Sequence, residues 1–308
     1  MHSSPSPIMP TVPAVHHRSI DIDGISVFYR EAGSPQSPKL LLLHGFGASS
    51  YMFRDLMPRL ASHYHVIAPD LPGFGQTSVP ADLDFDWTFD RLASVIERFT
   101  EAKEMARYAL YVFDYGAPVG WRLAVAHPHR ISAIVTQNGN GYEAGLSEGW
   151  APMRKAWAAP TAENREALRQ FNTLDMTKWQ YTEGVADSSL IAPETWQLAH
   201  AATERIGVEI QMDLLLDYGS NIAQYPQLHD YFVRHQPPLL AIWGRNDPFF
   251  VPAGAEAFKR DLPAAQVQFL DTGHFAIETH GGDIAAAMLA FLAQVQVPPL
   301  SRPAAAAR

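Results

Sequence analysis

Cysteine is missing from this chain of 308 residues, and so is any long apolar segment. Without cysteine the chain can form no disulfide, no thiolate metal site and no cysteine nucleophile. No apolar run comes near the ~20 residues that a helix needs to cross a bilayer. Residues 1–15 are rich in proline and serine and lack the apolar core of a signal peptide. We therefore expect a cytoplasmic protein with a disordered leader at 1–15 and a flexible tail at 297–308.

Basic residues are also scarce, since 23 lysines and arginines against 32 aspartates and glutamates give a formal net charge of -9. This balance argues against nucleic acid or an anionic membrane as a partner, because either would favour a basic patch. The 13 histidines show no metal-ligand spacing, so the sequence predicts no metal and no cofactor. We expect a small-molecule substrate as the partner of a monomer or homodimer.

Strand patterns and helical patterns alternate along most of the chain. After an initial strand hairpin, apolar strands alternate with amphipathic helices, which predicts a mostly parallel sheet with helices on both faces. The alternation stops for about a hundred residues that have helical patterns, many aromatic side chains and no clear strand. We therefore predict an α/β fold with its core at 16–137 and 237–296 and an inserted helical cap at 138–236.

One predicted strand ends on a carboxylate. The uncharged run 108–113 is typical of a buried central strand in a parallel sheet, and Asp114 follows it at once. Open α/β sheets place their chemistry at the carboxyl ends of strands. Gly116 and Ala117 provide the small residues that a tight turn into a helix requires. The sequence thus predicts a nucleophile elbow in which aspartate replaces the more familiar serine.

Three other predicted strands also end in polar motifs. An apolar strand ends at His44-Gly45, a later one runs into Asp247, and the last one is followed by His274. Asp114, Asp247 and His274 therefore occur along the chain in the order nucleophile, acid, histidine. A match at several strand ends in the right order is much less easily produced by chance than a match at one.

The chain resembles α/β-hydrolase-fold enzymes of the epoxide hydrolase and haloalkane dehalogenase branch. The motifs that carry this resemblance are His44-Gly45-Phe46-Gly47, Asp70-Leu71-Pro72-Gly73-Phe74-Gly75, Phe113-Asp114-Tyr115-Gly116, Trp243-Gly244-Arg245-Asn246-Asp247 and Gly273-His274-Phe275. The resemblance implies the α/β-hydrolase fold with an eight-stranded sheet. It also implies that Asp114, His274 and Asp247 are catalytic. Backbone N–H groups of Phe46 and Tyr115 would form the oxyanion hole.

An aspartate at the elbow has consequences for mechanism. A carboxyl group with a reference pKa of about 3.9 is ionised at neutral pH, so it can attack an electrophilic carbon without a base. The product of that attack is an alkyl ester on Asp114. His274 would then activate a water that hydrolyses the ester, while Asp247 orients and stabilises the imidazole.

The expected substrate is small and mainly apolar, because the predicted cap is rich in tryptophan and has few basic groups. The residues that we expect to contact it are mostly aromatic, and His44 among them is expected to shape the oxyanion loop. They are His44, Tyr142, Trp150, Trp179, Tyr181, Tyr218, Tyr225 and Phe275.

Dehalogenation and epoxide hydrolysis are the two reactions of this branch, and the motifs of this chain match neither of them completely. Dehalogenases commonly have tryptophan where Tyr115 stands and asparagine where Phe46 stands, to bind the leaving halide. Epoxide hydrolases use cap tyrosines as acids, and this cap offers several, although Gly47 and Tyr115 replace the usual proline and tryptophan. We therefore predict an epoxide hydrolase, with haloalkane dehalogenation or a non-hydrolytic, receptor-like role as alternatives.

A second serine-hydrolase-like motif lies at Gly145-Leu146-Ser147-Glu148-Gly149. No buried strand precedes it, so the strand-to-helix context of a nucleophile elbow is missing. We expect Ser147 to have no catalytic role.

Overall fold

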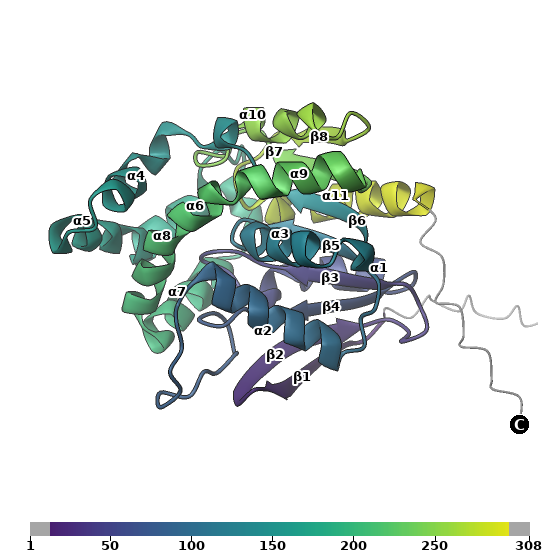
Figure 1. Ribbon diagram of the computed structural model, residues 1–308, viewed down its shortest axis with the longest axis horizontal. Coiled ribbons are helices and arrows are strands. Elements are labelled where there is room, and N and C mark those ends of the chain that lie inside the picture. Colours follow the sequence, from purple (N-terminus) through teal and green to yellow (C-terminus); the bar gives the residue numbers. More distant parts are fainter. Residues whose placement is uncertain (1–12, 296–308) are drawn as a thin grey trace, which may run out of the picture.

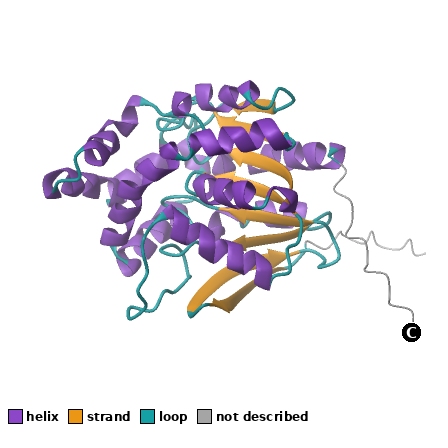
Figure 2. Cartoon of the chain, in the orientation of Figure 1, coloured by secondary structure: helices purple, strands orange, loops and turns teal. Residues whose placement is uncertain are grey.

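The computed structural model describes residues 13–295 and is built around one eight-stranded sheet (Figures 1 and 2). The strand order is β1-β2-β4-β3-β5-β6-β7-β8. Strand β2 runs antiparallel to both of its neighbours, β1 and β4, and all the pairs from β4 across to β8 are parallel. The strands are β1 (Val15–Ile22), β2 (Ile25–Ala32), β3 (Lys39–Leu43), β4 (His65–Pro69), β5 (Tyr108–Phe113), β6 (Ile131–Gln137), β7 (Leu239–Gly244) and β8 (Gln266–Leu270). The predicted mostly parallel sheet is confirmed.

Helices cover both faces of the sheet (Figure 1). One face packs against α2 (Phe89–Ala102), α3 (Gly116–Ala126), α9 (Tyr225–His235) and α10 (Pro252–Ala257) through one cluster of buried apolar side chains. The other face packs against α1 (Leu56–Leu60) and α11 (Ala276–Gln294) through a second cluster. The central strands β3 to β7 are almost entirely buried between the two clusters, as their uncharged sequences require.

Between β6 and β7, where every residue is described, the chain forms helices joined by loops and adds no strand to the sheet, which confirms the predicted helical insertion. Its α-helices besides α9 are α4 (Ala151–Ala158), α5 (Ala162–Glu166), α6 (Leu174–Thr182), α7 (Glu194–Ile206) and α8 (Val208–Ala223). Its short 3-10 helices are η3 (Glu143–Gly145), η4 (Glu148–Trp150), η5 (Ala167–Asn172) and η6 (Ser188–Leu190). Three more 3-10 helices lie outside the insertion: η1 (Ser50–Phe53), η2 (Pro128–Arg130) and η7 (Phe258–Arg260). We call the segment from η3 to α8 the cap.

The structure differs from the sequence expectations mainly at helix ends. The sequence pattern at 50–60 predicts a single helix, but the structure divides it into η1 and α1, with Arg54 and Asp55 between them. The pattern near the end of the chain predicts a last helix from Asp283, but this helix begins at Ala276, immediately after the last candidate site residues. The expected leader falls outside the described residues except for residues 13–15, and the expected tail falls outside them entirely.

Candidate active site

The candidate site is built on the turn from β5 into α3. Asp114 lies between them with φ of 46°, in the left-handed region that few residues other than glycine adopt. The helix α3 starts at Gly116, where an added Cβ would lie 2.3 Å from the carbonyl oxygen of Leu43. The chain therefore accepts backbone strain at Asp114 and needs glycine two residues later to turn this sharply.

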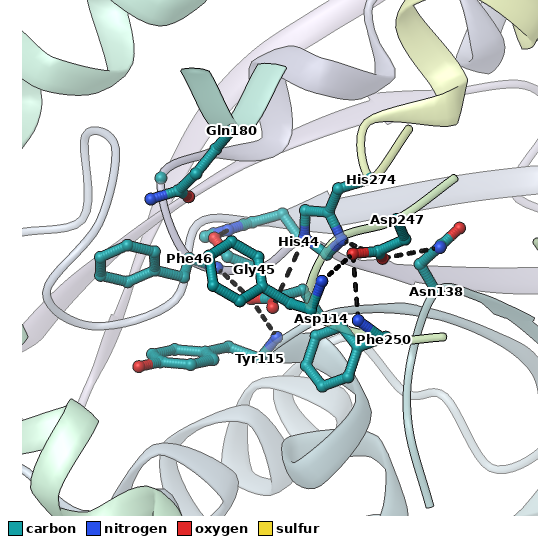
Figure 3. A network of polar contacts seen from close by, with 12 residues as sticks. His44, Gly45, Phe46, Asp114, Tyr115, Asn138, Gln180, Asp247, Phe250 and His274 are labelled. Carbon is teal, nitrogen blue, oxygen red and sulfur yellow. Dashed lines mark hydrogen bonds and ion pairs between the residues drawn. The ribbon is translucent and has the colours of Figure 1, made fainter. Parts of the chain in front are cut away.

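The carboxylate of Asp114 is only 6% exposed, and its two oxygens have different partners. Oδ1 accepts hydrogen bonds from the backbone N–H groups of Phe46 and Tyr115, both at 2.6 Å (Figure 3). Oδ2 lies 3.6 Å from Nε2 of His274. The two N–H groups that the sequence suggested as an oxyanion hole thus converge on this carboxylate, and the second oxygen faces the imidazole.

His274 lies between two carboxylates. Its Nδ1 is 2.6 Å from Oδ2 of Asp247, and its ring packs against Phe113 and Phe250. Burial lowers the pKa of His274, but attraction to Asp247 and hydrogen bonding to Asp114 outweigh it and raise the pKa to about 10. The two neighbouring carboxyl groups therefore favour the imidazolium form of the ring.

Asp247 is fixed from both sides. Its Oδ1 accepts hydrogen bonds from the backbone N–H groups of Phe249 and Phe250, and its Oδ2 accepts one from Asn138 Nδ2 at 2.8 Å in addition to contacting His274. Asn138 was not among the site residues predicted from the sequence. The available signal was its position directly after β6, the strand between β5 and β7, and the structure gives it a left-handed φ of 46°.

A cavity of about 30 Å³ lies against Asp114 and His274, with space for about two water molecules. Its walls are mostly apolar and come from both the core and the cap. They consist of Phe46, Asp114, Tyr115, Trp150, Met153, Phe171, Gln180, Leu215, Phe249, Phe250 and His274. Among the predicted substrate-contacting residues, only Trp150 lines this cavity.

Three of the predicted contact residues support the loop after β3 instead. His44 is fully buried, and its Nε2 accepts a hydrogen bond from the N–H of Leu71. Tyr181 donates a hydrogen bond from its hydroxyl to the carbonyl oxygen of Gly47 at 2.9 Å and stacks on Phe275 with ring centroids 3.7 Å apart. These side chains fix the position of Phe46 and His274 without reaching the cavity.

The remaining predicted contacts do not line the cavity either. Tyr142 donates its hydroxyl hydrogen to Asp261, and Trp179 is 37% exposed at the surface of α6. Tyr218 is buried behind Tyr115 with ring centroids 5.6 Å apart, and Tyr225 accepts a hydrogen bond from the side chain of Asn140. Burial raises the pKa of Tyr218 well above its usual value.

Most cavity residues were missed from the sequence. Met153, Phe171, Leu215 and Phe249 are apolar residues in helical or loop segments, and no pattern separates them from ordinary core positions. Only its position suggested Gln180, because it directly precedes Tyr181, one of the predicted substrate contacts.

The C-terminal end of α6 is tied to the loops that carry the imidazole and its partner. The backbone around Glu183 packs so closely on Gly273 that a Cβ added there would lie 1.8 Å from the Glu183 carbonyl oxygen. Asn246 donates a side-chain hydrogen bond to the carbonyl oxygen of Gly184 at 2.9 Å. One cap helix is therefore fastened next to both His274 and Asp247.

Ser147 lies outside the site. It caps the 3-10 helix η4, where its hydroxyl oxygen accepts a hydrogen bond from the N–H of Gly149 and its hydroxyl hydrogen goes to the Pro248 carbonyl. Within residues 13–295 no cluster of three or more histidines and carboxylates has the geometry to hold a metal ion. Over the same range no helix has the length and apolar character to span a bilayer.

The chain belongs to the alpha/beta hydrolase fold family, whose model matches residues 38–281. An uncharacterized hydrolase from Saccharomyces cerevisiae is 40% identical over 93% of this chain and all of its own length. A haloalkane dehalogenase from Mycobacterium marinum is 27% identical over 86% of this chain and 88% of its own. The resemblance inferred from the motifs is thus confirmed.

Solved structures agree with the sheet described above. A haloalkane dehalogenase from Bradyrhizobium elkani superposes with a TM-score of 0.70 at 22% identity, covering 92% of this chain and 99% of its own. A putative lipase from Acinetobacter baumannii gives a TM-score of 0.75 at 22% identity, with 92% of each chain covered. These likenesses establish the α/β-hydrolase fold.

Proposed function

We propose that this protein hydrolyses a small, apolar haloalkane through a covalent ester on Asp114. The observation that carries the proposal is the arrangement of the Asp114 carboxylate, which is held by two backbone N–H groups and faces a histidine paired with a second carboxylate. A carboxylate is a nucleophile without prior deprotonation, so this arrangement suits displacement at carbon better than attack on an ester carbonyl.

In the first step an oxygen of Asp114 forms a bond to the substrate carbon as the carbon–halogen bond breaks. The electron pair of that bond leaves with the halide ion. The N–H groups of Phe46 and Tyr115 orient the attacking carboxylate, and the mostly apolar cavity walls suit an apolar substrate. The product of this step is an alkyl ester of Asp114.

Esterification changes the protonation of His274. In the free enzyme, attraction to the two carboxylates outweighs burial and raises the pKa of His274 to about 10. The ester has no negative charge, so the contribution of Asp114 is lost and the effect of burial, which lowers the pKa, gains weight. The imidazolium can then release its proton, and the base becomes available after the ester has formed.

In the second step Nε2 of His274 takes a proton from a water molecule, whose oxygen attacks the ester carbonyl carbon. The N–H groups of Phe46 and Tyr115 stabilise the oxyanion of the tetrahedral intermediate. Its collapse breaks the bond to the alkoxide, which receives the proton from His274 and leaves as an alcohol. The second proton of the water passes from the Asp114 carboxyl group to His274, which restores the carboxylate and the imidazolium. The net reaction converts haloalkane and water into alcohol, halide and a proton.

Haloalkane dehalogenation is preferred over epoxide hydrolysis because named relatives of this chain are haloalkane dehalogenases. The hydroxyls of Tyr142 and Tyr181 are also occupied by Asp261 and the Gly47 carbonyl. Epoxide hydrolysis remains the second candidate, since the hydroxyls of Tyr218 on α8 and Tyr225 on α9 form a hydrogen-bonded pair and Tyr218 packs on Tyr115. Burial raises the pKa of both tyrosines, which makes them poorer acids.

The test is mass spectrometry on the His274→Gln variant, which keeps the nucleophile but lacks the base for the second step. Incubation with a haloalkane should add the alkyl group alone to the peptide that contains Asp114, because the halide has left. Incubation with an epoxide would add the whole epoxide mass, so the two reactions give different adducts. The double variant His274→Gln with Asp114→Ala is the matched control and should gain no mass.

An adduct of whole-epoxide mass, with none from any haloalkane, would move the proposal to the second candidate. No adduct from either panel, together with wild-type turnover of a carboxylic ester, would refute the ester mechanism. A receptor-like role predicts binding without any adduct, although a receptor has no need to keep Asp114, Asp247 and His274 together.

A further inference from the structure

Gln180 is a polar side chain in an otherwise apolar part of the cavity. It lies on α6, is only 5% exposed and shares the cavity wall with Asp114 and His274. Figure 3 shows it extending from the cap toward Phe46. Burying a primary amide without good hydrogen bonds is costly, so a buried glutamine without them calls for an explanation.

The hydrogen-bonding capacity of Gln180 is largely unused among the described interactions. Its Nε2 donates one long hydrogen bond, 3.5 Å from the carbonyl oxygen of Phe171, which leaves its second N–H free. The Oε1 atom lies 3.6 Å from the Cβ position built on Gly47, the residue that follows Phe46, whose N–H holds Asp114. The amide is therefore close to the nucleophile loop and has a donor to spare.

The other hydrogen-bond donors among the cavity-lining side chains are bonded to other groups or point away from Asp114. Trp150 donates its indole N–H to the carbonyl oxygen of Phe249 at 3.1 Å. The hydroxyl of Tyr115 points away from Asp114 in Figure 3, and its ring lies against Phe89. Among the described residues, the Tyr115 hydroxyl also has no hydrogen-bond partner, but it points away from Asp114, so Gln180 is the better placed of the two lining donors.

The position of Gln180 is fixed by its neighbours on α6. Tyr181 is hydrogen-bonded to the Gly47 carbonyl and stacked on Phe275, and the end of the helix is fastened to Gly273 and Asn246. A donor held on a rigid element needs little reorganisation when charge develops in front of it.

We infer that the Nε2 amide of Gln180 donates a hydrogen bond to the halide as it leaves the substrate carbon. The inference rests on the proposed function, whose first step puts negative charge on the leaving atom. Asp114 and Gln180 line the same cavity, so a halogen on a carbon next to Asp114 can lie within reach of the amide. An amide can stabilise a halide ion by hydrogen bonding but cannot protonate an alkoxide, so Gln180 favours halogen over epoxide oxygen as the leaving group.

The test compares ester formation on Asp114 in His274→Gln protein with and without Gln180→Met, which keeps the length of the side chain and removes the amide. Single-turnover rates are measured with chloro-, bromo- and iodoalkanes of one chain length. Loss of one charge-assisted hydrogen bond, worth about 1.5–3 kcal/mol, should slow ester formation about 10- to 100-fold. The slowing should be largest for chloride, the poorest leaving group.

Gln224→Met is the matched control, because the Gln224 amide is bonded to Asp90 away from the cavity, and it should leave the rates unchanged. Hydrolysis of the ester once formed, measured with His274 intact, should also be unaffected by Gln180→Met, whereas a general loss of structure would slow both steps. Equal ester-formation rates with and without Gln180→Met for all three leaving groups would overturn the inference.

Bromide binding separates this inference from the proposed function. Bromide should quench the fluorescence of the native protein, since Trp150 lines the cavity, and Gln180→Met should raise its dissociation constant at least tenfold. If no haloalkane esterifies Asp114 in the His274→Gln protein, the proposed function fails, while weakened bromide binding would still support the assignment of Gln180. Unchanged bromide binding in Gln180→Met would count against that assignment whatever the substrate.

Discussion

Replacing Asp247 with asparagine removes the charge that holds His274 protonated. The substitution also creates a conflict between donors. Oδ1 of Asp247 accepts two backbone N–H groups, and Oδ2 faces Asn138 Nδ2 and the imidazole N–H. The NH₂ group of an asparagine must face one of these sets, so one buried hydrogen-bond donor meets another, at a cost of about 1–3 kcal/mol.

The contribution of the Asp247 charge to the pKa of His274 can be calculated from the contact between Nδ1 of His274 and Asp247 at 2.6 Å. With charge centres about 4 Å apart and an effective dielectric constant of about 20, the attraction is about 4 kcal/mol, or about three pKa units. Since the pKa of His274 is raised to about 10 in the native protein, Asp247→Asn should bring it down close to the value of about 6.5 for an unfolded chain.

The pH dependence of stability follows from this shift. A histidine whose folded pKa is raised stabilises the protein fully below the unfolded pKa, and this stabilisation is lost as the pH rises from about 6.5 to about 10. Asp247→Asn should remove that dependence. The loss of unfolding free energy caused by the substitution should therefore be about 4 kcal/mol larger at pH 6 than at pH 10.

The assay is urea unfolding of both proteins at several pH values, because contributions from other titrating groups cancel in the difference. Proton NMR of the imidazole, assigned with His274→Gln, gives the pKa directly. A difference in unfolding free energy that stays constant from pH 6 to pH 10 would refute the reasoning, and so would a His274 pKa that stays close to 10 in the variant.

Three further substitutions test other parts of the site. Asn138→Ala removes a hydrogen bond to Asp247 and should slow ester hydrolysis about tenfold with little effect on ester formation, as rapid-quench kinetics can measure. Gly116→Ala would place a Cβ 2.3 Å from the Leu43 carbonyl oxygen and should lower ester formation at least ~100-fold, measured on protein whose circular dichroism shows that it is folded. Ser147→Ala should leave turnover unchanged and lower the free energy of unfolding by about 1 kcal/mol, because Ser147 caps η4. Loss of turnover in this variant would show that Ser147 has a catalytic role after all.

The core was predictable from the sequence because its signals are local. Uncharged strands such as 108–113 can be stable only between two layers, and the small residues after Asp114 indicate a sharp turn. Four polar motifs at strand ends then had to meet at one edge of the sheet, which brought Asp114, Asp247 and His274 to the same place.

The cavity was not predictable in the same way, because it depends on how helices of the cap pack. Aromatic residues such as Tyr142 and Tyr225 suggested a binding surface, but both are used in packing and hydrogen bonds elsewhere. Met153 and Leu215 line the cavity although their sequence context is that of any buried helix position. Asn138 could have been found by extending the strand-end argument to β6, since it directly follows that strand.

The fastening of α6 has a consequence for how the substrate range of this protein can change. A helix that is hydrogen-bonded to the loops of Gly47 and Asn246 and packed on Gly273 cannot be remodelled without displacing the oxyanion donor, the imidazole and its carboxylate partner together. Met153 on α4 and Leu215 on α8 line the same cavity from other helices of the cap. Adaptation to larger substrates, in nature or in a directed-evolution experiment, should therefore accumulate substitutions on α4 and α8 and leave the inner face of α6 unchanged.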